Sequence, residues 1–342
     1  MKGVSMKVSE TGIRSLTRRS LLRGAAALGL ASLCARPSRG AAPKKVSLRF
    51  NWTAKGEFTP LYFAREMGFF ADQGLEVDLR EGKSGTQAVQ VVGAGSDHFG
   101  YVPSIQVVQG INQGIPIQVT GTFGRVTGMC WASWPEVPLD GPKALEGHKV
   151  SVSSASTFFQ VWPAFVKKYG IDLAKVEAVN ADPSARVGLF LSRRLDIMAD
   201  IFVANDFVVL QSKVKEKLNL LRLSELDFDP VGYVLIANRG LLQSDPDLAR
   251  KFSLAVRKGF QAMVAEPKAA IATMTKLYGD RLGAEVIAGQ VARLLPLLNR
   301  SPALGMSNEA DWTRSLDLLQ QAGVIEKKLA LKEYFTNQFV GG

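Results

Sequence analysis

Short strand patterns that alternate with helical patterns constrain this sequence more than any other feature. Residues 46–50 and 75–79 alternate apolar and polar side chains, which is the period of a half-buried strand. A helical pattern covers residues 58–67 between them, and further strands are expected at 98–102 and 115–121. This order predicts a parallel sheet with helices on both faces.

A second unit repeats this order from residue 149 onward. Its strands and helices are expected at 149–152, 158–169, 176–179, 194–200 and 204–217. The run 231–237 should then return to the first sheet, and the pattern after Pro246 is helical. The sequence therefore predicts two α/β lobes with a helical C-terminal tail. Residues 43–122 and 231–342 form a discontinuous first lobe in this interpretation, and residues 123–230 form an inserted second lobe.

The N-terminus carries the pattern of an export signal. Arg18 and Arg19 stand directly before residues 24–35, an uncharged stretch that is shorter than the about 20 residues needed to span a bilayer. A basic segment followed by a short apolar segment and small residues is typical of a signal peptide. We therefore expect a twin-arginine signal over residues 1–40 and a periplasmic location.

Charge and cysteine content bear on the function class. Residues 1–40 contribute +7 of the formal net charge of +11, which leaves +4 for the rest and does not predict nucleic-acid binding. Cys130 is the single cysteine after residue 40, and the chain has two histidines, so we expect no disulfide framework, metal site or cofactor. We expect no lipid anchor at Cys34 either, because the bulky Leu33 precedes it. The sequence also lacks the common hydrolase and phosphate-loop motifs, which favours a binding protein over an enzyme.

Hydroxyl and aromatic side chains gather where the expected strands end. Ligands of open α/β sheets bind outside the carboxyl ends of the parallel strands. The candidate ligand-binding residues there are Trp52, Phe58, Tyr62, Ser84, Thr86, Tyr101, Ser104, Phe123, Ser154, Ser156, Thr157, Asp182 and Asp200. Hydroxyls beside helix N-termini can bind an anion or a carbonyl, and aromatic rings offer flat walls for a ring. Each residue has an ordinary alternative as a helix cap or a core side chain, but their recurrence at strand ends favours a ligand site.

The opening of the chain after the signal resembles one large protein family. Asn51-Trp52, residues 58–70 and Gly74-Leu75-Glu76-Val77 resemble the ABC-importer binding proteins for nitrate, sulfonates, taurine and pyrimidine precursors of thiamine. Three later stretches at 93–100, 145–152 and 191–197 resemble the same family in the same order. The resemblance implies a type II periplasmic-binding-protein fold with a ligand cleft between two lobes. It also implies a monomer that binds a small molecule by hinge closure and delivers it to an inner-membrane permease.

The ligand class stays open between two alternatives. The five aromatic candidates, together with Asp182 or Asp200, suit a pyrimidine-like or other aromatic heterocycle, which we favour because this set is the larger one. The hydroxyl candidates with Arg125 would suit a sulfonate, taurine or nitrate ion. An enzymatic branch of the family makes the thiamine pyrimidine, but it carries a cysteine-rich iron motif and a pocket histidine. Cys130 stands alone in this chain, and we expect His98 to be packed or at the surface.

The export signal gives a first testable prediction. Replacing Arg18 and Arg19 with lysine should leave the precursor in the cytoplasm, because the twin arginines carry the targeting information. Cell fractionation followed by immunoblotting measures the distribution. Normal periplasmic accumulation of the double variant would contradict our interpretation of the N-terminus.

Overall fold

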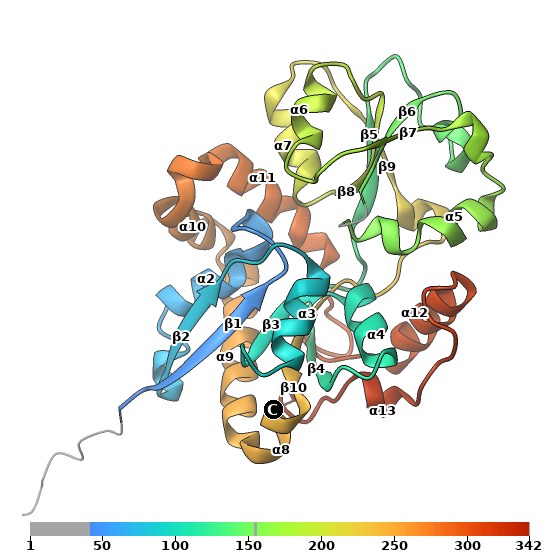
Figure 1. Cartoon of the computed structure of the whole chain (residues 1–342). Coiled ribbons are helices and arrows are strands. Elements are labelled where there is room, and N and C mark those ends of the chain that lie inside the picture. The colour runs from blue at the N-terminus through green and yellow to red at the C-terminus, as the bar shows by residue number, and fades with distance from the viewer. Residues whose placement is uncertain (1–41, 154–155, 342) are drawn as a thin grey trace, which may run out of the picture. The chain divides into compact units, whose positions relative to one another are not determined.

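The computed structural model describes residues 42–153 and 156–341, and this part of the chain contains two five-stranded sheets (Figure 1). The expected signal over residues 1–40 and the candidate Ser154 lie outside the described residues. Within those two described ranges, no helix is long and apolar enough to cross a membrane.

The first sheet has the strand order β2-β1-β3-β10-β4. Its strands are β1 Lys44–Phe50, β2 Leu75–Arg80, β3 Phe99–Pro103, β4 Ile117–Thr122 and β10 Tyr233–Asn238. β1 runs parallel to β2 and β3, whereas β10 runs antiparallel to β3 and β4. The four strands expected in the first unit and the returning strand are therefore all found in one sheet.

The second sheet repeats this topology in the order β7-β6-β8-β5-β9. Its strands are β5 Met129–Ser133, β6 Lys149–Val152, β7 Glu177–Asn180, β8 Ile197–Phe202 and β9 Asn219–Arg222. β6 runs parallel to β7 and β8, and β5 runs antiparallel to β8 and β9. In each sheet the inserted antiparallel strand, β10 or β5, is the first strand that the chain enters after leaving the other sheet.

Helices connect and cover these strands. They are α2 Thr59–Glu66, α3 Gly85–Gly93, α4 Ser104–Asn112, α5 Trp162–Tyr169, α6 Arg186–Leu191, α7 Asp206–Lys213, α8 Arg239–Ser244, α9 Pro246–Ala265, α10 Pro267–Leu282, α11 Ala284–Leu294, α12 Glu309–Gln321 and α13 Leu331–Tyr334. Ser84 caps α3 by accepting a hydrogen bond from Gln87 N at 3.1 Å, as is typical of serine at this position. The run α8 to α13 confirms the predicted helical tail.

Two strands of the second sheet were not expected from the sequence. β5 is buried along its whole length, so its side chains show no alternation of apolar and polar residues. The helix expected over 204–217 is shorter, because α7 ends at Lys213 and the chain then forms the four-residue strand β9. Burial rather than a local period thus determines β5, and pairing with β5 rather than a local period determines β9.

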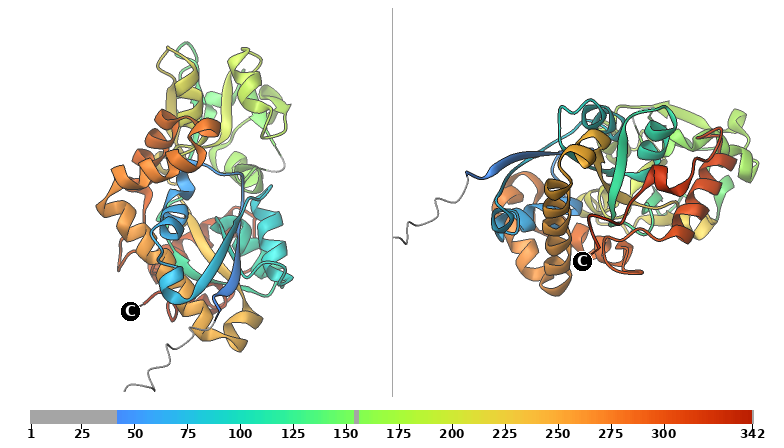
Figure 2. Two further views of the ribbon diagram at one scale, coloured as in Figure 1. Left: turned by 90° about the vertical axis from the view of Figure 1, so that its left-hand side faces the viewer. Right: turned by 90° about the horizontal axis from the view of Figure 1, so that it is seen from below.

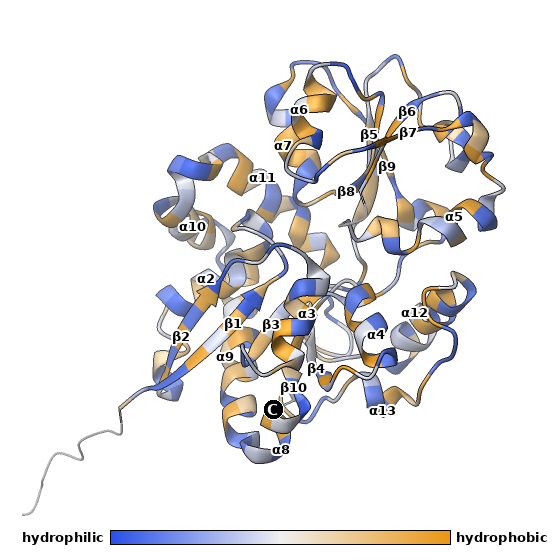
Figure 3. Cartoon of the chain, in the orientation of Figure 1, coloured by the Kyte–Doolittle hydropathy of each residue, from blue (hydrophilic) through white to orange (hydrophobic). Residues whose placement is uncertain are grey.

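Helix α9 lies against one face of the first sheet (Figures 1 and 2), and aromatic side chains make this contact. Phe252 stacks on Phe99 of β3 with ring centroids 3.9 Å apart, and Phe260 stacks on Phe123 at 4.1 Å. Colouring by hydropathy shows apolar residues along the strands of both sheets and on the helix faces that cover them (Figure 3). Packing of these apolar faces supplies the main stabilisation of the fold.

Two connecting segments, residues 123–128 and 223–232, join the sheets. They lie against each other, because Gly232 N donates to Gly124 O at 3.0 Å and Phe123 N donates to Tyr233 O at 3.0 Å. A Cβ atom at Gly232 would lie 2.1 Å from Val126 O, and one at Gly124 would lie 2.4 Å from Tyr233 N. Only glycine therefore fits where these segments meet. The exact lobe boundaries given by the sequence stay a prediction.

Gly232→Ala should lower the stability of the protein, because the new methyl group would overlap a backbone carbonyl that cannot move freely. Overpacking of this kind costs about 1–3 kcal/mol, and thermal denaturation measures it as a lower Tm. Gly188→Ala is the matched control, since a Cβ atom at this exposed position in α6 would contact nothing within 4 Å. The control should be neutral or more stable by up to about 1 kcal/mol. Equal Tm values for the two variants would contradict the close packing of the segments.

Candidate functional site

A small cavity lies where strand ends of the first sheet meet strand ends of the second. It is lined by Asn51, Trp52, Lys55, Ser84, Gly85, Ser156, Thr157, Pro183, Arg186, Asp200, Phe202, Asn205 and Asp206. Asn51 and Trp52 follow β1, whereas Asp200 and Phe202 end β8. The cavity therefore occupies the carboxyl edge of both sheets, where ligands of such folds bind. Its volume is about 50 Å³, which is room for a few water molecules only.

Lys55 places an ammonium group in the wall of this cavity. Its side chain is only 4 % exposed, and Nζ lies 2.5 Å from Glu57 Oε2 and 2.9 Å from the hydroxyl of Tyr233. The rings of Phe58, Tyr233 and Phe202 lie within 5.6 Å of Nζ. Burial alone would lower the pKa of Lys55, but the carboxylate of Glu57 and the hydroxyl of Tyr233 raise it above its ordinary value. Lys55 therefore stays charged at neutral pH.

Tyr233 completes this arrangement as a neutral acceptor. Burial raises the pKa of Tyr233 to about 12, although the charge of Lys55 lowers it in part. The hydroxyl is therefore protonated and accepts a hydrogen bond from Lys55 Nζ. An ammonium group donates three hydrogen bonds, and Glu57 and Tyr233 accept two of them, so one N–H remains for the cavity.

Arg186 contributes a second buried cation, held between two carboxylates. Its Nη1 lies 2.9 Å from Asp200 Oδ2, and its Nη2 donates to Asp206 Oδ1 at 2.9 Å. Burial lowers the pKa of Arg186, but both carboxylates raise it, and the net pKa lies above the ordinary value. The cations of the cavity wall are thus all matched by acidic partners.

Several buried polar atoms of this wall make no hydrogen bond within the described part of the chain. These atoms are Asn51 Oδ1, Arg186 Nε and Asp200 Oδ2, although the last lies in the ion pair with Arg186. Buried polar atoms without a partner are rare and costly. Asn51 Oδ1 is therefore available to accept a hydrogen bond from a bound molecule, and Arg186 Nε is available to donate one, as is the remaining N–H of Lys55.

Hydrogen bonds beside the cavity join the elements of the two sheets. Gln106 Nε2 in α4 donates to Thr157 Oγ1 at 3.1 Å. Gln290 in α11 donates to Asn205 Oδ1 at 2.9 Å and also accepts a hydrogen bond from Gly56 N. Since Thr157 and Asn205 themselves line the cavity, these contacts hold its walls together in this arrangement.

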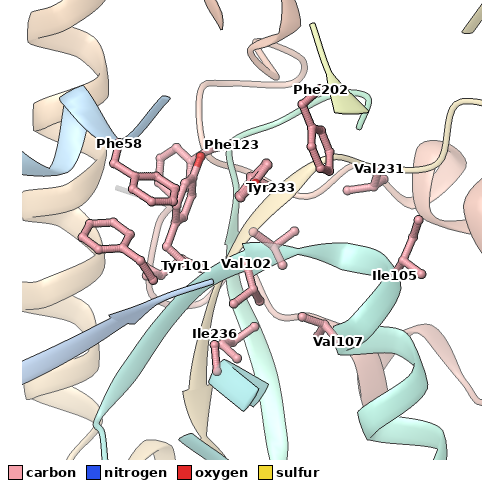
Figure 4. Packing of buried hydrophobic residues seen from close by; sticks show 14 of the residues in the cluster. Phe58, Tyr101, Val102, Ile105, Val107, Phe123, Phe202, Val231, Tyr233 and Ile236 are labelled. Carbon is pink, nitrogen blue, oxygen red and sulfur yellow. The ribbon is translucent and has the colours of Figure 1, made fainter. Parts of the chain in front are cut away.

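The structure brings five of the candidate residues into the cavity and leaves four aromatic ones out. Trp52, Ser84, Ser156, Thr157 and Asp200 line it. The four rings that belong to the core instead are Phe58, Tyr62, Tyr101 and Phe123, each at most 1 % exposed. Figure 4 shows three of them, Phe58, Tyr101 and Phe123, within the packed core. Phe58 stacks on Phe50 at 4.1 Å, and Tyr101 stacks on Tyr233 at 5.2 Å. The expectation that these four rings form the ligand walls is corrected, because they turn inward to pack between the sheet and its helices.

The remaining candidates lie elsewhere for local reasons. Thr86 is exposed in the first turn of α3, and Ser104 donates to Val231 O rather than capping a helix. Asp182 is exposed and accepts hydrogen bonds from Ser184 N and Oγ, while its neighbour Pro183 reaches the cavity. Arg125 is exposed.

Eight residues of the cavity wall were not among the candidates: Asn51, Lys55, Gly85, Pro183, Arg186, Phe202, Asn205 and Asp206. Lys55 lies three residues after the candidate Trp52, so its place beside the same strand end could have identified it as a site residue. Arg186 and Asp206 each begin a helix, where a single charged residue forms no recognisable pattern. Only the fold brings their side chains together.

Comparison with known proteins gives a family, relatives and a fold. The model of the family described as NMT1/THI5 like matches residues 55–270. The 4-amino-5-hydroxymethyl-2-methylpyrimidine phosphate synthase of Aspergillus parasiticus is 24% identical over 241 residues, which are 66% of this chain and 68% of that protein. The riboflavin-binding protein RibY of Chloroflexus aurantiacus is 22% identical over 320 residues, which are 90% of each chain.

A solved structure supports the architecture. The periplasmic aliphatic sulphonate binding protein SsuA of Escherichia coli superimposes with a TM-score of 0.68 at 15% identity, over 86% of this chain and 92% of that chain. This likeness confirms the predicted periplasmic-binding-protein fold with two α/β units.

Lys55→Met should destabilise the protein by about 3–5 kcal/mol, because it leaves the buried carboxylate of Glu57 without its cation. Thermal or denaturant-induced unfolding measures the loss. The double variant Lys55→Met with Glu57→Leu should regain most of it, since replacing a whole buried pair by apolar residues is often nearly neutral. A single variant as stable as the original chain would show that the ion pair is not buried in solution.

Proposed function

The chain belongs to the NMT1/THI5-like family, and we propose that it is the periplasmic solute-binding component of an ABC importer for a neutral nitrogen heterocycle of about pyrimidine size. The observation that carries this proposal is the cavity wall, which combines one aromatic ring from each sheet with cations that are each paired with a carboxylate of the protein. Such a wall suits a flat, uncharged molecule.

Trp52 and Phe202 are the two rings of the wall. Trp52 is half-buried in the loop after β1, and Phe202 ends β8, so they come from different sheets. A planar ligand held between the sheets would stack on at least one of them. Stacking of a base on an aromatic side chain contributes about 1–3 kcal/mol to binding.

The polar atoms without partners favour a ligand that both donates and accepts hydrogen bonds. Asn51 Oδ1 has no donor, whereas Arg186 Nε has no acceptor. An aromatic ring nitrogen beside an amino or N–H group offers both. A sulfonate or nitrate ion offers acceptors only and would leave Asn51 Oδ1 unsatisfied in a buried site. The names of two relatives, a methylpyrimidine phosphate synthase and a riboflavin-binding protein, support the same ligand class.

Ligand entry requires the walls of the cavity to move. A space of about 50 Å³ is too small for a molecule of pyrimidine size, and hydrogen bonds from Gln106 and Gln290 hold the walls together. The paired segments around Gly124 and Gly232 are the natural hinge, since they connect the two sheets. We therefore propose that the protein binds its ligand by opening and closing at these segments.

The chemistry of the cavity wall favours binding over catalysis. Its thirteen lining residues include no histidine and no cysteine. Burial raises the pKa of Cys130 in β5 well above its ordinary value, which makes this thiol unreactive. His98 Nδ1 accepts a hydrogen bond from Ser47 N in the first sheet. Within the described ranges, no group of three or more His, Cys, Asp or Glu residues is placed to hold a metal ion.

A thermal-shift panel tests the ligand class directly. It contains 4-amino-5-hydroxymethyl-2-methylpyrimidine, riboflavin and ethanesulfonate, and a compound at 100 times its Kd stabilises the folded state by about 2.7 kcal/mol. We expect a heterocycle to raise Tm and ethanesulfonate to leave it unchanged. Small-angle scattering should then show a smaller radius of gyration in the heterocycle complex. Stabilisation by ethanesulfonate alone would overturn the neutral-ligand proposal.

Trp52→Ala provides the residue-level test with the heterocycle found by that panel. Loss of one stacking wall should weaken binding about 5- to 150-fold, which corresponds to about 1–3 kcal/mol. Isothermal titration calorimetry measures the change. Phe159→Ala is the matched control, because Phe159 is an exposed aromatic residue that does not line the cavity. Unchanged affinity of Trp52→Ala would count against stacking.

A further inference from the structure

Both terminal nitrogens of Arg186 are paired with aspartates of the protein. Nη1 donates to the carbonyl of Asp200 at 2.7 Å and also lies 2.9 Å from its Oδ2, while Nη2 donates to Asp206 Oδ1 at 2.9 Å. Arginine binds sulfonate-like and carboxylate ions through two parallel N–H groups and its positive charge. Here both Nη1 protons and one Nη2 proton are used within the protein, and two carboxylates already match the charge, while Nε makes no hydrogen bond within the described residues.

Neither carboxylate is free to swing away from Arg186. Asp200 Oδ1 accepts a hydrogen bond from Ser151 Oγ at 2.7 Å, and Asp206 Oδ2 accepts one from Phe202 N at 3.1 Å. The side chains of Asp200 and Asp206 are 2% and 13% exposed. The three charged groups therefore form a fixed unit with a net charge of −1, one face of which lines the cavity.

We infer that Asp200 and Asp206 are specificity-determining residues, which occupy Arg186 and thereby exclude anionic ligands from the cavity. The inference rests on the proposed function, because it concerns which molecules the same cavity accepts. Lys55 is a weak alternative anchor for an anion, because one of its N–H groups remains for the cavity but the carboxylate of Glu57 already matches its charge. An entering oxyanion would meet no unpaired cation among the cavity residues.

A purely structural role is the competing explanation. Arg186 begins α6, Asp200 lies in β8 and Asp206 begins α7, so the unit also holds these elements together. A structural role predicts that removing one carboxylate lowers stability and leaves ligand preference unchanged. A specificity role predicts that the same change lets an anion bind.

Asp206→Asn tests the inference in the full chain, with ethanesulfonate as the anionic probe and 4-amino-5-hydroxymethyl-2-methylpyrimidine as the neutral one. The substitution keeps the side-chain shape and removes one negative charge close to Arg186. A unit charge within a few ångströms changes an equilibrium by more than about tenfold even at an effective dielectric constant near 20. We therefore expect calorimetry at low salt to show at least about tenfold tighter ethanesulfonate binding than in the original chain. Added salt should reduce this gain, since it screens the interaction.

Asp140→Asn is the matched control, because Asp140 is an exposed aspartate on the loop between β5 and β6, outside the cavity. The affinity of Asp140→Asn for each probe should equal that of the original chain. Asp200→Asn is the second variant and should also gain ethanesulfonate binding. If both cavity variants fold and neither gains ethanesulfonate binding, or if neither variant folds, the carboxylates are structural and the inference is overturned. Heterocycle binding by the original chain would still support the proposed function in that case. Tight ethanesulfonate binding by the original chain would overturn both.

Discussion

The contact between the two connecting segments at Gly124 and Gly232 is the one on which the cavity depends. It allows the chain to leave the first sheet after β4 and to return as β10 beside β3. Tyr233 is the first residue of β10, so this contact fixes where its hydroxyl lies. That hydroxyl accepts a hydrogen bond from Lys55, which in turn faces Phe202 of the second sheet. A backbone approach that only glycine permits thus sets the position of a charged group in the cavity wall.

Burying charged groups around the cavity is energetically unfavourable, and ligand recognition explains their presence better than stability does. Removing charged groups from water is unfavourable, and apolar replacements of a buried ion pair are often as stable or more stable. This chain nevertheless buries Lys55 with Glu57, and Arg186 with two aspartates, at one edge of the sheets. Because both units border the same small space, we interpret them as part of ligand selection.

The sequence predicted much of the fold because most strands and helices carry a local period. β5 and β9 escaped this reasoning, since one is buried along its whole length and the other follows the stretch 204–217 that was expected to be helical. Three residues chosen by the rule that ligands bind at strand ends, Trp52, Ser84 and Asp200, line the cavity. The rule failed for rings such as Phe58 and Tyr101, because position after a strand does not determine whether a side chain turns toward the cavity or the core. Packing against neighbouring aromatic rings decides that direction.

One fold serves several functions among the proteins similar to this chain, whose names indicate a synthase, a riboflavin binder and a sulfonate binder. The fold alone therefore does not choose between an anion and a heterocycle. The choice lies in whether the cations at the strand ends are already matched by carboxylates of the protein. In this chain Asp200 and Asp206 pair with Arg186, and Glu57 pairs with Lys55, while Asn51 Oδ1 and Arg186 Nε have no partner among the described residues. A wall with an acceptor, donors and a ring from each sheet is complementary to the edge and face of a nitrogen heterocycle, whereas a sulfonate or nitrate ion brings no donor for Asn51 and meets cations that are already paired.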